Sequence, residues 1–209
     1  YYAFEQAGWT MIEDITEGFG GFLGERSVGG FGCCSVLATE QEGVITTGGG
    51  ALILTQKKRK AGELKRMSEQ LHREQMMPDM NAALALAQMN RIDADLERRR
   101  EIEGIFRRAL MQSGHSLPVQ PASEEAEIHR IPYGFPVLLK SGMKDAVKYA
   151  AKHGVEAAPA FSGTIAATEA AESCPVARDL ARRTLLFPLY PALTSTEVEA
   201  VRKVLTTLP

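Results

Sequence analysis

The segment Cys33–Thr55 reads CCSVLATEQEGVITTGGGALILT and combines apolar runs with three consecutive glycines. Cys33–Leu37, Val44–Ile45 and Ala51–Thr55 are rich in residues that favour extended structure. The triplet Gly48–Gly50 predicts a tight turn where backbone passes close to another group, because glycine adopts positive φ at low cost. We therefore predict a strand at 33–37, a short strand at 44–45, a turn at 48–50 and a strand at 51–55.

The residues before this segment predict another strand with an acidic end. Thr10-Met11-Ile12 is a short apolar run followed directly by Glu13-Asp14. Residues 18–32 then contain seven glycines in fifteen positions, which predicts tight turns and little helix.

The residues after the segment favour helix. Helix formers dominate from Gln56 to Pro78, and Asp79 opens a stretch that we predict to be helical to about Gln112. Unbroken, that helix would be about 50 Å long, a length that commonly connects two bodies. Its apolar residues follow mostly helical spacings, which predicts one buried stripe. They are Met80, Leu84, Ile92, Leu96, Ile102, Phe106 and Leu110.

The remainder predicts a smaller mixed region. Thr194 and Glu197 have capping-box spacing at the start of the final helix. Strands and helices intermixed in this way indicate α/β for the first part and a small α+β lobe for the last. The expected elements are a linker at 113–127, strand at 135–139, helix at 143–153 ended by Gly154, helix at 177–183, extended chain at 185–189 and helix at 195–205.

Size and composition exclude several classes of protein. The 209 residues can bury a proper core, and 24 Lys and Arg against 26 Asp and Glu indicate no nucleic-acid surface. The three cysteines suggest a reducing, cytoplasmic location, since the adjacent pair rarely meets disulfide geometry. No apolar run approaches the roughly 20 residues of a membrane span. Tyr1 is not an initiator methionine, so we expect part of a longer chain.

Five blocks in this order resemble the DegT/DnrJ/StrS family of pyridoxal-phosphate aminotransferases, which act on nucleotide-linked keto-sugars. The blocks cover nearly the whole chain. They are IEDITEGFGG, VGGFGCCS, VITTGGGALILT, PDMNAALALAQMNRIDADLERRREI and CPVARDLARRTLLFPLYPALTSTEVEAV.

The resemblance implies a fold type I (aspartate-aminotransferase-like) α/β protein that is a homodimer with active sites at its interface. Residues 1–113 would be part of the large domain, with a mainly parallel sheet and a long connecting helix. Residues 114–209 would be the small α+β C-terminal domain. The upstream half of the family's large domain, with its phosphate loop and stacking aromatic ring, is absent from this sequence.

Asp14 matches the family's aspartate that keeps the cofactor's ring nitrogen protonated. An aspartate after a strand more often caps a turn, and the segment alone favours that role. The resemblance reverses this preference. Glu17 stands where the family usually has a glutamine against the ring, and a carboxylate there would repel the cofactor's phenolate oxygen.

Ser35 matches the serine that hydrogen-bonds the cofactor phosphate, although an ordinary strand serine is an equally good interpretation. About five residues later the family places its Schiff-base lysine, and this sequence has Glu40. No lysine occurs before Lys57, and the first histidine is His72, so the family's histidine variant is also excluded. Without the amine, ordinary transamination lacks its central group.

A further departure precedes the long helix. The family carries an Asn-x-Arg pattern whose asparagine reaches the neighbouring phosphate, and here Glu74, Gln75 and Met76 align with it. A carboxylate repels phosphate, and methionine lacks the donors of arginine.

Other candidate sites favour plain structural interpretations. The basic run Lys57–Lys60 is best read as a solvated helix start rather than an anion site. We assign no metal, since neither the four histidines nor the cysteines have ligand spacing.

Three hypotheses follow. The first is a family member that has lost the lysine, cannot transaminate, and binds pyridoxal phosphate non-covalently if at all. It would bind a nucleotide-linked sugar or a partner subunit, as a homodimer or hetero-oligomer. The second is an active aminotransferase completed by missing N-terminal residues or a partner subunit. The third is a cofactor-free binding or assembly module on the same scaffold.

Overall fold

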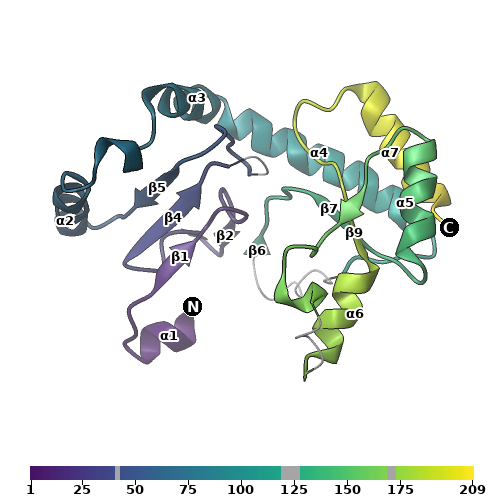
Figure 1. The fold of residues 1–209 in the computed structure, drawn as a ribbon, viewed down its shortest axis with the longest axis horizontal. Coiled ribbons are helices and arrows are strands. Elements are labelled where there is room, and N and C mark those ends of the chain that lie inside the picture. The colour runs from purple at the N-terminus through teal and green to yellow at the C-terminus, as the bar shows by residue number, and fades with distance from the viewer. Residues whose placement is uncertain (41–42, 119–127, 169–172) are drawn as a thin grey trace. The chain divides into compact units, whose positions relative to one another are not determined.

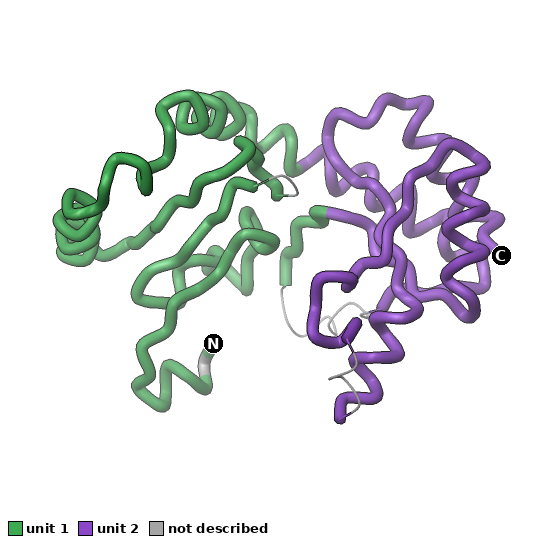
Figure 2. Tube along the Cα trace, in the orientation of Figure 1, with its two compact units in different colours: residues 1–96, 122–133 green, residues 97–121, 134–209 purple. Residues whose placement is uncertain are grey.

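The computed structural model describes residues 1–40, 43–118, 128–168 and 173–209 of the chain. These residues form two compact units (Figures 1 and 2). Unit 1 contains residues 1–96 and 122–133, and unit 2 contains residues 97–121 and 134–209.

Unit 1 is built on a three-stranded sheet of order β1-β4-β5. β1 pairs with β4 in parallel, and β4 pairs with β5 in antiparallel orientation. A second small sheet has the order β3-β2-β6. The elements are α1 (Tyr2–Gln6), β1 (Ile12–Asp14), β2 (Phe22–Leu23), β3 (Arg26–Ser27), β4 (Cys34–Ala38), β5 (Ala51–Leu54), α2 (Lys58–Ser68), the 3-10 helix η1 (Arg73–Gln75), α3 (Asp79–Met89), the start of α4 (Ile92–Leu110) and β6 (Ile128–His129).

One face of the main sheet is packed and the other is open. Ile15 and Leu37 pack with Ile45 and with Ala85 of α3. This agrees with the alternation of buried residues along β4, because successive strand residues point to opposite faces. The predicted strands at 33–37 and 51–55 are therefore confirmed within one residue.

Unit 2 packs helices on an antiparallel sheet of order β7-β9-β8. Its core joins Phe106 and Ile102 of α4 to Phe135, Phe187 and the buried face of α7. The elements are the rest of α4, β7 (Phe135–Leu138), α5 (Met143–Lys152), β8 (Ala158–Pro159), the 3-10 helix η2 (Ile165–Ala167), α6 (Pro175–Arg183), β9 (Thr184–Phe187) and α7 (Ser195–Thr207).

The ends of two helices follow the sequence prediction. Glu197 Oε2 accepts the Thr194 N–H at 2.8 Å, and Thr194 Oγ1 accepts the Glu197 N–H at 3.3 Å, which confirms the capping box of α7. Gly154 follows α5 with φ +73°, as its predicted role of ending that helix requires.

The single long helix predicted from Asp79 to Gln112 is wrong. α3 ends at Met89 and α4 begins at Ile92. The expected stripe fails in α3, where Met80 is 75% exposed and α3 buries Ala85 instead. A helical period alone does not reveal this change of buried face.

The short strand predicted at Val44–Ile45 is also wrong. Both residues are buried in a loop, with Ile45 fully enclosed. Thr39 closes this loop, since its N–H donates to Gly50 O and its carbonyl accepts the Thr47 N–H at 2.8 Å. The pair is buried by packing rather than by a strand ladder.

The packing units differ from the predicted division at 113/114 in two segments. Residues 97–113 belong to unit 2 because α4 contributes Ile102 and Phe106 to its core. Residues 128–129 belong to unit 1 because β6 pairs with β2. The division into domains stays a prediction, and the predicted linker at 113–127 lies partly outside the described residues.

Candidate functional site

Asp14 lies exposed at the carboxyl end of β1, where the sequence places it. Its Oδ1 accepts hydrogen bonds from the Thr16 N–H at 3.0 Å and the Thr16 hydroxyl at 2.7 Å. The hydroxyl bond, followed by the backbone bond, lowers the pKa of the Asp14 carboxyl. Thr16 Oγ1 also accepts the Ala38 N–H at 3.1 Å, which ties the ends of β1 and β4 together. An ionised carboxylate is thus held at this edge of the sheet, in the turn-capping geometry that the segment alone favours.

Ser35 lies on the other face of the sheet. In the ladder it pairs with Glu13, one residue before Asp14, and side chains alternate along each strand. Its hydroxyl is buried and has no hydrogen-bond partner in the part of the chain that the structure describes. A Cβ at Gly29 would come within 3.1 Å of the hydroxyl oxygen. The structure therefore does not bring Ser35 and Asp14 together.

Glu17 and Glu40 line one pocket of about 520 Å³ in unit 1. Both side chains belong to exposed residues, so the pocket carries two carboxylates at its surface. Neither Asp14 nor Ser35 lines it. Among the described residues, the lining is Thr16, Glu17, Ala38, Glu40, Gly43, Gly48 and Gly49. Residues 41 and 42 lie outside the described residues.

Gly48 and Gly49 of the glycine triplet line this pocket. Gly48, Gly49 and Gly50 have φ of +79°, +143° and +106°, which confirms the predicted glycine turn. Thr47 Oγ1 lies 2.8 Å from both Thr39 Oγ1 and Gly49 O, so two threonines brace the turn.

Glu13 is a residue that the sequence analysis did not select. Its side chain is buried, and Oε1 accepts the Phe31 N–H at 2.7 Å and the Gly32 N–H at 2.6 Å. Oε2 accepts the Gly29 N–H at 2.9 Å. The only signal in the sequence is an acidic residue before a glycine-rich segment, which does not tell Glu13 from Asp14.

The other candidates contribute little to this pocket. Glu74, Gln75 and Met76 are exposed on and after η1.

Across the described ranges, no group of three or more His, Cys, Asp and Glu side chains is placed to hold a metal ion. No helix in those ranges is long and apolar enough to span a lipid bilayer.

Comparison with known protein families identifies the family of this chain. The sequence profile of the DegT/DnrJ/EryC1/StrS aminotransferase family matches residues 4–206. The chain belongs to this family. The predicted family resemblance is therefore confirmed.

Two curated relatives align along most of the chain. The GDP-perosamine synthase of Escherichia coli O157:H7 is 26% identical over 205 residues, which are 90% of this chain and 55% of that protein. The UDP-N-acetyl-3-dehydro-alpha-D-glucosamine 3-aminotransferase of Acidithiobacillus ferrooxidans is 26% identical over 220 residues, 96% of this chain and 58% of that protein. The chain thus spans little more than half the length of these relatives.

The family fold is also found in solved structures. DesV of S. venezuelae, crystallised in complex with a ketimine intermediate, superposes with a TM-score of 0.84 at 16% identity. The match covers 99% of this chain and 59% of that one. The predicted fold class, part of a fold type I α/β protein, is confirmed.

Proposed function

We propose that this chain is a nucleotide-sugar aminotransferase homologue that has lost the Schiff-base lysine and does not transaminate. The observation that carries the proposal is Glu40, five residues after Ser35, in a chain whose first lysine is Lys57. A carboxylate cannot form an imine with an aldehyde, so the group that would hold the cofactor covalently is replaced.

The described residues fit pyridoxal phosphate poorly. When bound, this cofactor supplies an electron sink, for which a carboxylate must keep its ring nitrogen protonated. Asp14 is suited to that role, because its lowered pKa keeps it ionised. Glu17 and Glu40 oppose binding, because two carboxylates in one pocket repel a phosphate and a phenolate. Ser35 points its hydroxyl to the other sheet face. If the cofactor binds, we expect non-covalent, weak binding.

A second candidate function is a binding or assembly module. Ile12 and Ile53 are 63% and 58% exposed, and the register of β1, β4 and β5 puts them on the same sheet face. Exposed apolar residues that share a sheet face favour a covering partner. We propose a homodimer or hetero-oligomer, with a nucleotide-linked sugar as the small-molecule candidate. An active enzyme completed by missing N-terminal residues or a partner subunit, and a cytoplasmic location, stay predictions.

Borohydride trapping tests the loss of the lysine. We would incubate the chain with pyridoxal phosphate, follow imine absorbance, reduce with borohydride and map any modified lysine by mass spectrometry. We expect no site-specific adduct in the unaltered chain. A stoichiometric adduct at one lysine would contradict the proposal and favour an active enzyme.

The matched variants are Glu40→Lys and Glu40→Gln. Glu40→Lys restores an amine to the pocket, and we expect a borohydride-fixed adduct at residue 40. Glu40→Gln removes the charge without adding an amine, and we expect reversible binding at most. If Glu40→Lys forms no adduct while its circular dichroism is unchanged, the assignment of this position is contradicted.

Light scattering of the unaltered chain tests the proposed assembly. A monomer at all concentrations would contradict the homodimer or hetero-oligomer.

A further inference from the structure

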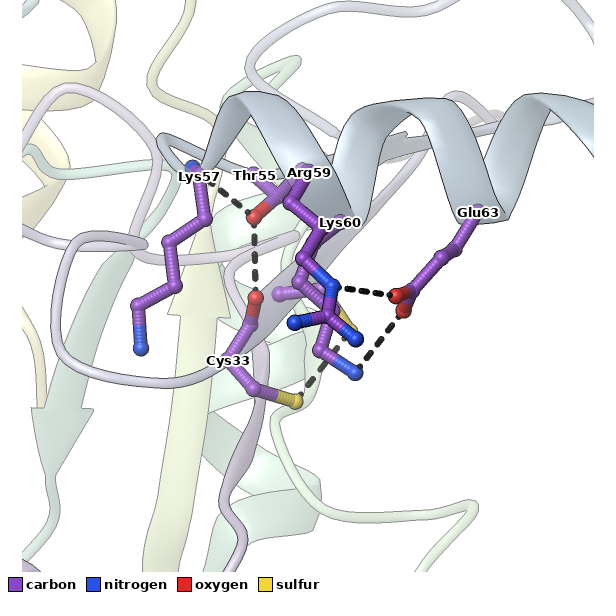
Figure 3. Close-up of polar contacts among 7 residues, drawn as sticks. Cys33, Thr55, Lys57, Arg59, Lys60 and Glu63 are labelled. Carbon is purple, nitrogen blue, oxygen red and sulfur yellow. Dashed lines mark hydrogen bonds and ion pairs between the residues drawn. The ribbon is translucent and has the colours of Figure 1, made fainter.

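Two adjacent cysteines lie at the amino end of β4, away from the pocket of Glu40. The Sγ atoms of Cys33 and Cys34 are 3.8 Å apart, and both residues are half-buried and free of disulfides. Figure 3 shows Cys33 beside the first turn of α2. Cys33 comes just before the strand, so its side chain does not follow the alternation of faces along β4 and can contact the Cys34 sulfur.

A disulfide within the pair does not suit this geometry. Consecutive Cα atoms are about 3.8 Å apart across a trans peptide, whereas disulfides usually need roughly 4.4–6.8 Å. The two sulfurs are better placed to bind the same metal ion. A tetrahedral ion with metal–sulfur distances of about 2.3 Å holds two thiolates roughly 3.8 Å apart. This is the separation that the pair already has, so chelation requires no movement of either sulfur.

The surrounding residues hold the pair in place. Cys34 pairs with Ile12 in the sheet. Thr55 Oγ1 donates to Cys33 O at 2.9 Å and accepts the Lys57 N–H at 3.3 Å, which links the strand start to α2 (Figure 3). The backbone of both cysteines is thereby fixed from two sides.

Burial favours the protonated form of the Cys34 thiol in the metal-free pair. Burial and the neighbouring Cys33 raise the pKa of the Cys34 thiol, while the nearby ammonium of Lys60 acts in the opposite direction. Lys60 Nζ lies 3.1 Å from the carboxylate of Glu63, which also pairs with Arg59 at 3.2 Å. These ion pairs hold the cations at the start of α2.

We propose that Cys33 and Cys34 form a two-thiolate chelate for a soft, thiophilic divalent metal ion such as Zn²⁺. No third protein ligand joins them in the described ranges, so water fills the remaining positions. Binding releases the thiol protons as the metal–sulfur bonds form. The sequence alone predicts no metal here, because ligand spacing does not reveal how close two sulfurs lie. The site is independent of the proposed function.

Titration with Cd²⁺ under reducing conditions tests the chelate, since thiolate-to-metal charge transfer reports sulfur ligands directly. We expect one ion per chain and displacement of Cd²⁺ by Zn²⁺. Cys33→Ser and Cys34→Ser should each weaken binding by about tenfold or more, because the second thiolate acts at a high effective concentration.

Cys174→Ser is the matched control, because it removes the third, exposed cysteine outside the pair. We expect its charge-transfer band and affinity to equal those of the unaltered chain. Circular dichroism verifies that each variant is folded. Three results would overturn the intramolecular chelate. They are an equal affinity for Cd²⁺ in all three variants, loss of the charge-transfer band in Cys174→Ser alone, and a stoichiometry of one ion per two chains.

Discussion

Neighbouring acidic residues at the end of β1 have different physical roles. Glu13 is buried and accepts three backbone N–H groups, whereas Asp14 is exposed and caps the Thr16 turn. Glu17 is exposed at a pocket that Glu40 also lines. Three backbone N–H groups hold the Glu13 carboxylate inside unit 1, whereas the carboxylates of Glu17 and Glu40 lie at the pocket, where they would repel an anionic ligand.

Removing the Glu13 carboxylate should destabilise unit 1. Glu13→Ala leaves three N–H groups of residues 29–32 without their acceptor, and we expect the free energy of unfolding to fall by about 3 kcal/mol. Urea unfolding followed by circular dichroism measures the change. Glu17→Ala is the control, since that side chain is exposed and should change stability by less than about 0.5 kcal/mol. Equal effects of the two variants would contradict the role of Glu13.

At the scale of elements, the loop between β4 and β5 combines a glycine turn with buried side chains. Its glycines 48–50 have positive φ, and Ile45 is fully buried beside Leu37. A Cβ at Gly50 would come within 2.6 Å of Met77 Cε. The sequence predicts the turn correctly, and the packing adds that the Met77 side chain would have to move for a Cβ at Gly50 to fit.

Alanine substitution should destabilise the chain at Gly50 of the turn but not at Gly62 of α2. Gly50→Ala forces a side chain onto a backbone with φ +106° and against Met77, so we expect a loss of about 2 kcal/mol. Gly62→Ala is the matched control within α2, where the added Cβ meets nothing within 4 Å. There we expect a gain of up to about 1 kcal/mol, because alanine favours helix. Thermal unfolding measures the change in stability of both variants. A Gly50→Ala variant as stable as the unaltered chain would contradict the need for positive φ at this position.

At the scale of the whole molecule, α4 contributes to both units. Leu96 is buried with Val44 and Ile131 in unit 1, while Phe106 is buried in the core of unit 2. The Phe106 ring meets that of Phe135 edge-on, with centroids 5.4 Å apart. The long buried stripe predicted for this region is therefore realised in α4 alone and is shared between two cores.

The unit 2 core should depend strongly on Phe106. Phe106→Ala removes a fully buried ring, and we expect a loss of about 3–5 kcal/mol in the free energy of unfolding. Met111→Ala, just after the end of α4, is the control because its side chain is 84% exposed. Denaturant unfolding measures both, and a loss below about 1 kcal/mol in Phe106→Ala would contradict the described core.

Much of the architecture could be read from the sequence. Strand propensity predicts β4 and β5, capping chemistry predicts the start of α7, and the order of the motifs predicts the family. The break between α3 and α4 could not be predicted, because the residues on both sides keep a helical period. The strand at Val44–Ile45 was predicted wrongly because buried loops and strands share apolar composition.

The sequence by itself determined the family, the fold class, the glycine turn and the absence of any lysine before Lys57. Tertiary structure decided which acidic side chain is buried, which sheet face carries Ser35, and how close Cys33 and Cys34 lie. The physical reason is that these features depend on strand register and on hydrogen bonds between distant segments. Local propensity encodes neither, since Glu13 meets its donors 16 to 19 residues along the chain.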